Sequence, residues 1–384
     1  MARSEEVRSK FREIYGDEAA VYRAPGRVNL IGEHTDYNEG FVFPAAIDLF
    51  AWIAIAPRSD RRIHLQSQNL GQEAEFDLDA GPRAASREWS SYVFGVALVL
   101  EQRGYPLRGA NLLIRGDVPI GAGVSSSAAL EVAAGFALLA NSGTAIDGTQ
   151  LALCCQKAEN DFVGTRCGIM DQLASACCVR GRALLLDCRS LEFRTVPLPA
   201  GVRLVICNSM VKRELAASAY NTRRSECEEG VRLIAERFPG VRALRDVTME
   251  QLESCEGSLP ENVYKRCRHV VSEDARVIRA ADALEHNRLD DLRSLMAKSH
   301  RSLRDDYEVS CAELDLLVEL ASEAKGVHGA RMTGAGFGGC TINLVDSEAV
   351  AEFQRRISTG YEQRTGLKPD IYVCDASDGV QQAE

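Results

Sequence analysis

The spacing of apolar and polar positions divides the chain into a first half rich in strands and a second half rich in helices. Apolar residues three and four apart predict helices, and apolar residues two apart, or in short runs, predict strands. In the first half this predicts helices over residues 3–15, 89–103, 126–140 and 149–162, and strands over 21–30, 41–56, 58–66, 110–116, 183–186 and 191–196. In the second half it predicts strands over 202–208, 329–332, 340–345 and 370–374, and helices over 218–238, 264–285, 289–303, 312–324 and 348–365.

Three segments interrupt this pattern. Pro25-Gly26 is expected to break strand 21–30, and residues 41–56 resemble a strand, a turn and a second strand. The polar segment 71–88 is expected to form a surface loop or hairpin.

Mixed strands with clustered helices predict an α+β fold. A chain of 384 residues favours two domains, which we place at 1–190 and 191–384.

Composition narrows the classes of function. The net charge is −10 with no basic run, which argues against nucleic-acid and membrane-surface binding, and no apolar stretch is long enough to span a bilayer. The start of the chain lacks a signal sequence, so we expect a cytoplasmic protein. The 13 scattered cysteines include no CxxC pair, which predicts reduced thiols in the core.

A glycine- and serine-rich turn precedes the helix predicted from Ser126. The segment Asp117–Glu131 reads DVPIGAGVSSSAALE, with two glycines that allow a tight turn and three serines suited to capping a helix. A helix N-terminus presents free N–H donors that favour a phosphate. The motif is neither a Walker A loop nor GxGxxG, and a turn into a capped helix without a ligand remains the alternative.

A second glycine-rich run, Met332–Cys340, contains GxGxxG but is followed by a strand, so it fails the Rossmann context. Its small residues allow another segment or a ligand to approach the backbone. The alternative is a simple turn between strands.

Two further segments concentrate polar chemistry. Residues 27–36 place Arg27, Asn29 and several acidic and hydroxyl side chains in one short region, which suits a site that binds sugar hydroxyls. A solvated acidic loop is the alternative. Asp171 follows a glycine-marked turn, where it would accept a proton from a hydroxyl or simply begin a helix. Glu159 is a candidate Mg²⁺ ligand or a plain surface charge.

Together these segments resemble the GHMP superfamily of small-molecule kinases. Residues 26–38 resemble the sugar motif of the galactokinase family, 119–128 the ATP motif, and 332–340 the third motif of the superfamily. The resemblance runs from about residue 20 to Cys374. It implies an N-terminal domain of the ribosomal-protein-S5 type, a C-terminal α+β domain and an active site in the cleft between them.

The resemblance also implies roles for matched residues. Asp171 and Arg27 are the expected catalytic pair. The sugar would be bound by Glu33, His34, Thr35, Asp36, Gly168, Asp171 and Tyr220. ATP would be bound by Ser67, Trp89, Gly121, Ala122, Gly123, Val124, Ser125, Ser126 and Ser127. Mg²⁺ would be held by Ser127 and Glu159. Val124, Ala129 and Ala219 depart from the commoner family residues.

The reaction that the resemblance predicts is transfer of the γ-phosphoryl group of MgATP to the C1 hydroxyl of α-D-galactose, giving galactose 1-phosphate and ADP, in galactose catabolism by the Leloir pathway. Positioning and charge stabilisation dominate such a transfer. Because an aspartate beside an arginine is a weak base, we expect Asp171 to orient the hydroxyl and accept its proton late. The partners expected are galactose and ATP, with the chain a monomer or weak homo-oligomer. Alternatives are a GHMP kinase for N-acetylgalactosamine, arabinose or mevalonate, a galactose sensor, and a binding module without chemistry.

Overall fold

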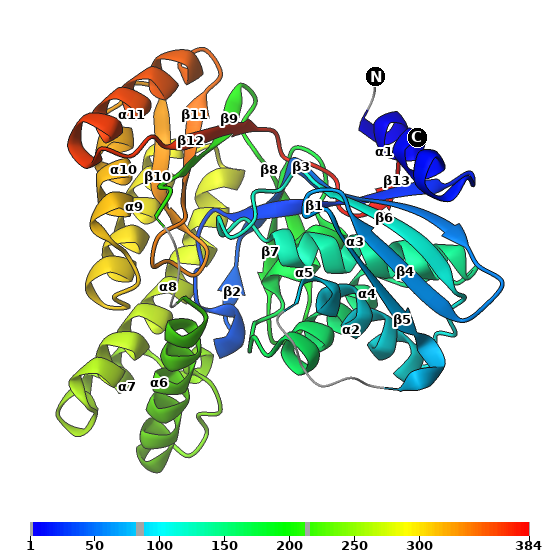
Figure 1. Ribbon diagram of the computed structural model, residues 1–384. Helices are drawn as coiled ribbons and strands as arrows, with labels where there is room; N and C mark the ends of the chain where they lie inside the picture. The colour runs from blue at the N-terminus through cyan, green and yellow to red at the C-terminus, as the bar shows by residue number, and fades with distance from the viewer. Residues whose placement is uncertain (1–2, 82–87, 212–215, 384) are drawn as a thin grey trace.

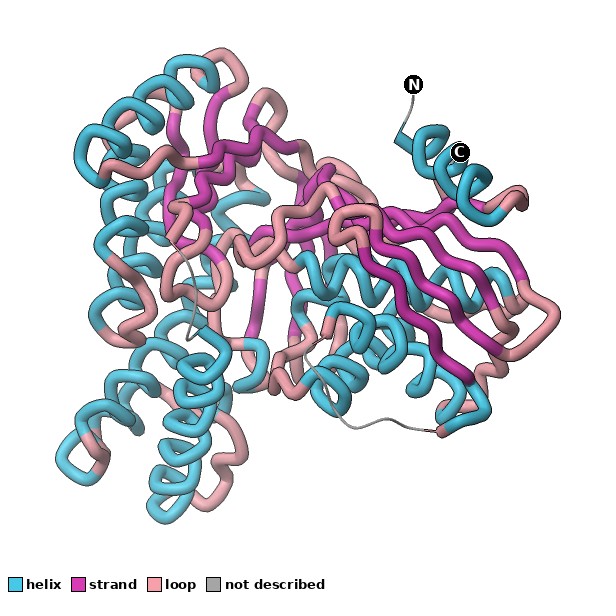
Figure 2. The backbone as a smooth tube through the Cα atoms, in the orientation of Figure 1, coloured by secondary structure: helices cyan, strands magenta, loops and turns pink. Residues whose placement is uncertain are grey.

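The computed structural model describes residues 3–81, 88–211 and 216–383, and for 216–218 the backbone only. The chain forms two lobes, one built on a six-stranded sheet and one on a four-stranded sheet with most of the helices (Figure 1). Figure 2 shows the strands of the two lobes as separate groups. The α+β fold expected from the sequence is confirmed.

The larger sheet has the strand order β13-β1-β3-β6-β4-β5 and forms the frame of the first lobe. Its strands are β1 Ala20–Asn29, β3 Pro44–Pro57, β4 Arg62–Ser67, β5 Gln72–Asp77, β6 Ala110–Gly116 and β13 Gln381–Gln382. Helices α2 Trp89–Gln102, α3 Ser126–Asn141, α4 Gly148–Ala158 and α5 Met170–Cys177 cover one face, and α1 Arg3–Tyr15 covers the other (Figure 1).

Strand β3 shows why residues 41–57 form a continuous apolar run. Ile53 and Ile55 pack under α2 and α3, whereas Trp52 and Ala54 pack under α1, so both faces of the strand are buried. The predicted turn inside this run is wrong: a two-residue strand, β2 Phe41–Val42, leads directly into β3. Segment 71–81 contains β5, which forms a hairpin with β4, and positions 82–87 of the predicted loop lie outside the described residues.

Pro25-Gly26 does not break β1 but shifts its pairing register with β3 between Pro25 and Arg27. Such a bulge re-aims the side chain that follows it. A Cβ at Gly26 would lie 2.7 Å from the carbonyl oxygen of Val124, so glycine lets the Gly/Ser turn pack directly on β1.

The second lobe is a four-stranded sheet flanked by helices. Its strands lie in the order β10 Val327–Thr333, β11 Cys340–Asp346, β9 Val202–Asn208 and β12 Asp370–Cys374. One face packs on α8 Glu261–Glu285 and α9 Leu289–Asp305, and the other on α10 Ala312–Ser322 and α11 Val350–Thr365. Helices α6 Ala216–Arg237 and α7 Met249–Glu253 extend from α8 at the lower edge of Figure 1.

Two pairings cross the predicted division at residue 190, which itself stays a prediction. Strand β8 Phe193–Pro197 pairs with β7 Arg182–Asp187, which in turn pairs with β2. After β12 the chain returns to the first lobe, where β13 joins the edge of β1. The lobes are therefore tied together at both ends of the second half.

The cysteines agree with the prediction of core thiols. None of the 13 forms a disulfide, and nine of them are buried. Within the described parts of the chain, helix length and apolar character fall short of what a membrane crossing needs.

Candidate active site

An ion pair joins two segments that are 144 positions apart in the sequence. Arg27, on β1 just after the bulge, donates from Nε to Oδ1 of Asp171 at 2.9 Å and from Nη2 to Oδ2 at 2.8 Å. Its Nη1 donates to the carbonyl oxygen of Gly123 at 2.8 Å. Arg27 is 4% exposed, so this two-bond pair fixes both side chains. Asp171 is the second residue of α5 and does begin a helix, as the alternative reading held, but its carboxylate faces Arg27.

The Gly/Ser turn wraps around this pair. Gly121, Gly123 and Ser125 all have positive φ angles, of 73°, 87° and 60°. The left-handed conformation is sterically unfavourable for a serine such as Ser125. Its hydroxyl donates to Asp171 Oδ2 at 2.5 Å. Helix α3 then begins at Ser126, so the first N–H groups of α3 follow directly. Alternating positive φ angles beside a helix N-terminus suit an anion such as a phosphate.

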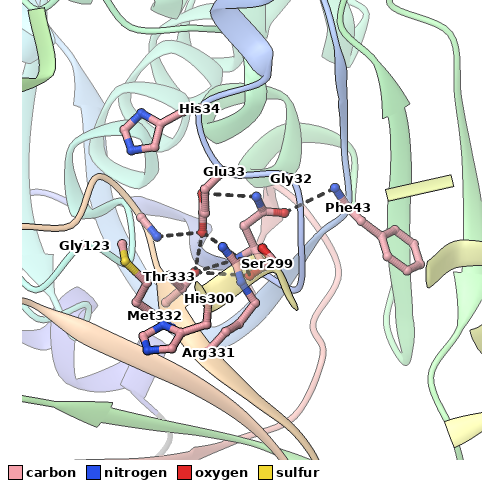
Figure 3. A network of polar contacts seen from close by, with 12 residues as sticks. Gly32, Glu33, His34, Phe43, Gly123, Ser299, His300, Arg331, Met332 and Thr333 are labelled. Atoms are coloured by element: carbon pink, nitrogen blue, oxygen red, sulfur yellow. Dashed lines mark hydrogen bonds and ion pairs between the residues drawn. The ribbon is translucent and has the colours of Figure 1, made fainter. Parts of the chain in front are cut away.

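Glu33 is held by the second glycine-rich run, Met332–Cys340 (Figure 3). Its Oε1 accepts from the backbone N–H of Gly334 at 2.7 Å and lies 3.1 Å from the hydroxyl of Thr333. A Cβ at Gly334 would lie 2.8 Å from the carbonyl oxygen of Gly123. The small residues of this run therefore allow the close approach of another segment that was expected from the sequence. Gly334 contacts both Glu33 and Gly123, so it links the Glu33 loop to the Gly/Ser turn.

His34 and Thr35 differ in what they offer to a ligand. The Nδ1 of His34 lies 2.8 Å from the Tyr37 hydroxyl and its Nε2 lies 3.3 Å from the carbonyl oxygen of Ala335. Burial lowers the pKa of His34 to about 3, so the imidazole is neutral. Thr35 is fully buried and its hydroxyl lies 2.9 Å from the Gly32 carbonyl and 2.6 Å from that of Phe41. The Thr35 hydroxyl thus stabilises the loop rather than facing the cavity.

Asp36 lies against Gly168. A Cβ built on Gly168 would lie 1.9 Å from Oδ2 of Asp36, so only glycine leaves room for this carboxylate. Burial, and then the negative charge of Asp171, raise the pKa of Asp36 to about 6. The carboxylate is therefore poised to change its charge close to neutral pH.

These side chains line one cavity of about 190 Å³. Its walls include the expected residues Arg27, Glu33, His34, Asp36, Glu159, Gly168, Asp171 and Tyr220. The rings of His34 and Tyr220 lie with their centroids 5.6 Å apart. A small cavity with carboxylates on several sides suits a polyhydroxylated ligand.

Glu159 belongs to a buried group of carboxylates. It begins a π-helical turn, Glu159–Val163, at the end of α4, a feature that often marks functional positions. The Gln172 amide donates to Glu159 at 2.7 Å and to the fully buried Glu131 at 3.0 Å. Burial, and next the charge of Asp171, raise the pKa of Glu159 to about 7. The buried position of Glu131 and Glu159 and the nearby charge of Asp171 favour the protonated form of these two carboxyl groups.

A second cavity, of about 400 Å³, is lined by both ends of the Gly/Ser turn. Among its lining residues are Ser67, Trp89, Gly121, Ser126 and Ser127, together with apolar Ile120, which is 73% exposed. Trp89, Leu70 and Ile120 give it a more apolar wall than the first cavity has, as expected for an aromatic base. The middle of the turn is bonded, through Gly123 and Ser125, to Arg27 and Asp171 in the wall of the first cavity.

The structure brings most predicted residues to these cavities. Five predicted residues line neither of them: Thr35, Ala122, Gly123, Val124 and Ser125. Ala122 and Val124 point into the core, at 3% and 1% exposure. Gly123 and Ser125 bind Arg27 and Asp171 instead. The central part of the turn thus positions the ion pair, while its ends face the second cavity.

Several lining residues were not predicted. The first cavity also includes Thr165, Cys167, Met170, Gly334 and Ala335, and the second also includes Asn69, Tyr92 and Ile120. The five extra residues of the first cavity could have been found, because three of them lie in the glycine-marked turn before Asp171 and two lie in the run Met332–Cys340. Glu131 and Arg331 line neither cavity, but both are buried charged residues near the site. Each is a single charge among mostly apolar or small neighbours, a pattern that indicates a buried charge with a specific role.

Three family models match this chain. Residues 9–57 match the galactokinase galactose-binding signature, 91–179 the GHMP kinases N terminal domain, and 280–363 the GHMP kinases C terminal domain.

Relatives and solved structures match nearly the whole chain. The chain is 49% identical to a galactokinase of Roseiflexus sp. (strain RS-1) over 376 residues, which is 98% of this chain and 96% of that protein. It is 51% identical to a galactokinase of Chloroflexus aggregans over 97% of this chain and 96% of that one. The crystal structure of Lactococcus lactis galactokinase complexed with galactose superposes with a TM-score of 0.95 at 37% identity, covering 99% of both chains. Mevalonate kinase of Methanococcus jannaschii, at 19% identity and a TM-score of 0.68, covering 94% of this chain and 99% of its own, shares the fold.

Proposed function

The chain belongs to the galactokinase family, and we propose that it transfers the γ-phosphoryl group of ATP to the C1 hydroxyl of α-D-galactose, giving galactose 1-phosphate and ADP. The observation that carries this proposal is the Arg27–Asp171 pair, which lies between a cavity rich in carboxylates and the Gly/Ser turn that leads into α3. A sugar in the first cavity and a triphosphate along the turn would meet at this pair.

Each group has one task in the proposed transfer. The N–H groups at the start of α3 bind the phosphates, and Arg27 offsets charge between the hydroxyl and the γ-phosphate. Asp171 accepts a hydrogen bond from the C1 hydroxyl, orients its oxygen for in-line attack and takes the proton late in the transfer. Glu33, His34, Asp36, Gly168 and Tyr220 enclose the rest of the sugar.

The function is tested by measuring ADP release with galactose, N-acetylgalactosamine, glucose and mevalonate in parallel. We expect galactose to give the highest kcat/KM by at least about tenfold, because hydroxyl-binding carboxylates discriminate strongly between ligands. A higher kcat/KM for another substrate would overturn the choice of galactose. Binding of galactose without ATP turnover would favour the sensor or the binding module.

We propose that Mg²⁺ is held by Ser127 and Glu159. The residues fit this ion, because Glu159 is buried and its pKa is raised by that burial and by the charge of Asp171, so a cation beside it would stabilise its ionised form. No cluster of three or more His, Cys, Asp or Glu able to hold a metal occurs among the described residues, which suits an ion bound mainly by the nucleotide phosphates. When bound, Mg²⁺ neutralises charge on the phosphate oxygens.

Replacing Glu159 by glutamine should raise the Mg²⁺ concentration needed for half-maximal turnover by about tenfold, with the KM for galactose little changed. The measurement is a Mg²⁺ titration at saturating ATP and galactose. Asp161→Asn is the matched control, since Asp161 is an exposed carboxylate two residues along the same turn. An unaltered Mg²⁺ dependence in Glu159→Gln would remove Glu159 from the metal site.

The KM for galactose should rise as the pH falls through 6. The ionised Asp36 carboxylate accepts hydrogen bonds from sugar hydroxyls more strongly than the neutral acid does, and the pKa of about 6 means that it is ionised above this pH and protonated below it. At pH 5 about a tenth of the molecules would carry the carboxylate, so KM should be about tenfold higher than at pH 8. His34 does not contribute, because its pKa lies near 3. Glu159 lines the same cavity and has a pKa of about 7, so the profile is also measured with Asp36→Asn, in which only the part due to Asp36 is lost. A KM that stays constant from pH 8 to pH 5 at saturating ATP and Mg²⁺ would contradict this role of Asp36.

We further propose that the activity is cytoplasmic, on the grounds of the free thiols and the need for ATP. A monomer or weak homo-oligomer stays a prediction.

A further inference from the structure

Arg331, on β10, is a fully buried arginine that does not touch the sugar cavity. Its Nη1 lies 3.1 Å from the carbonyl oxygen of Asn29 and 3.4 Å from Oε1 of Glu33. Its Nε and Nη2 have no hydrogen-bond partner among the described residues. A buried guanidinium with so few bonds is costly, which suggests that its charge serves a purpose other than stability.

Two buried carboxylates interact with the charge of Arg331, and among the described residues its hydrogen bond goes to Glu33 and not to Glu273. Glu273, on α8, is already occupied: it accepts from the N–H of Gly32 at 3.0 Å and from the Ser299 hydroxyl at 2.5 Å, and it pairs with Arg276 at 2.6 Å. Glu33 is the carboxylate that Arg331 contacts directly (Figure 3). The second lobe thus contacts the Glu33 loop from two elements: β10 through Arg331, and α8 through Glu273, which accepts from the N–H of Gly32.

The two oxygens of Glu33 are treated differently. Oε1 accepts from the N–H of Gly334 at 2.7 Å and lies 3.4 Å from Nη1 of Arg331. The Thr333 hydroxyl, 3.1 Å from Oε1, has one proton, which it can donate either to Oε1 or to the Asn29 carbonyl at 3.2 Å, so the donors around Oε1 fill its capacity of about two bonds. Within the described part of the chain, Oε2 receives only the Asn29 amide, at 3.1 Å. Because Glu33 lines the sugar cavity, Oε2 retains capacity to accept one hydroxyl of a ligand.

We propose that Arg331 is a positioning residue for sugar selection: with Thr333 and Gly334 it occupies Oε1 of Glu33, and so presents Oε2 as the acceptor for one particular sugar hydroxyl. This inference rests on the proposed function, and it adds a residue outside the cavity to the determinants of specificity. Asn29 completes the arrangement, since its Oδ1 accepts from the N–H of Phe43 at 3.2 Å while its amide holds Oε2.

The test compares Arg331→Met, which keeps the length of the side chain but removes its charge and donors, with Thr333→Val, which removes one smaller donor. The matched control is Arg266→Met, because Arg266 is a 3% exposed arginine that pairs with Glu226 and Glu308, away from Glu33. Each protein is assayed with galactose and with its 2-, 3-, 4- and 6-deoxy derivatives. The readouts are kcat, the KM for ATP, the KM for each sugar and the sugar Kd by calorimetry without ATP.

We expect Arg331→Met to raise the galactose KM and Kd about 10- to 100-fold, the range for loss of a charged hydrogen bond, with kcat and the ATP KM within about threefold of wild type. Thr333→Val should give a smaller rise, of about threefold. For one deoxygalactose the Kd should be nearly the same in wild type and Arg331→Met, because the hydroxyl that Glu33 accepts is already missing. Arg266→Met should leave every sugar Kd unchanged.

Three results would overturn the proposal: an unchanged galactose Kd, an equal loss of affinity for all five sugars, or a fall in kcat without a change in galactose affinity. If Arg331→Met lacks a cooperative thermal transition, Thr333→Val decides by the same pattern. If the wild type binds galactose without phosphorylating it, the proposed function fails while the calorimetric comparison still decides on Arg331. If it binds no sugar, both fail.

Discussion

Asp171→Asn is expected to lower kcat with galactose by about 10²- to 10⁴-fold, the usual contribution of a positioned proton acceptor. Asparagine has nearly the shape of aspartate, but it lacks the charge that accepts both bonds from Arg27 and the one from Ser125. The NH₂ group of the asparagine is itself a donor, so it would face at least one of the donor groups of Arg27 and Ser125. Arg27 would keep its bond to the Gly123 carbonyl and lose the carboxylate to which it makes two charged hydrogen bonds.

The measurement is ADP release at saturating galactose and ATP, with thermal unfolding measured on the same samples. Asp290→Asn is the control for the alternative that Asp171 merely favours the start of a helix, because Asp290 lies in the first turn of α9. If helix capping were its whole role, both variants would keep a near wild-type kcat. A kcat within about threefold of wild type for Asp171→Asn would remove this residue from the mechanism.

Long elements could be predicted from the sequence because their own periodicity determines them. Helices α3, α8 and α9 and strands β6 and β9 lie within a few residues of the predicted bounds. The missed elements are short: α5 has eight residues and β13 has two, and β13 exists only because it pairs with β1 from the far end of the chain. The register shift at Pro25 was invisible for the same reason, since a bulge is a property of two strands and not of one.

The site divides along a similar line. The motifs gave the residue types and the segments, and most of these residues do line the two cavities. They did not reveal which residues face a ligand and which hold its neighbours: Thr35 and Ser125 have the chemistry of ligand-binding residues, yet their hydroxyls bind protein atoms. Nor does local sequence show that Arg331 reaches Glu33, because that contact joins positions 298 residues apart.

At Gly168, the addition of one carbon atom is expected to disrupt the sugar cavity, because a Cβ there would clash with Asp36. The Cβ of alanine at this position would lie 1.9 Å from Oδ2, 2.1 Å from Cγ and 2.8 Å from Cβ of Asp36. All three distances are shorter than a van der Waals contact, so a change of the carboxylate's angle cannot relieve them and the whole side chain must shift. Glycine is required here by this approach and not by a positive φ angle.

Gly168→Ala is therefore expected to raise the galactose KM by about 10- to 100-fold, equivalent to the usual cost of overpacking, with a much smaller change in the KM for ATP. Gly240→Ala is the matched control, because a Cβ at Gly240 would meet nothing within 4 Å. The cause can be separated from general damage by adding Gly168→Ala to Asp36→Ala. Since truncating Asp36 removes two of the three clashing atoms, the second change should cost less than threefold more in KM. A galactose KM near wild type for Gly168→Ala, or full additivity in the double variant, would contradict the contact between Gly168 and Asp36 as the basis of sugar binding.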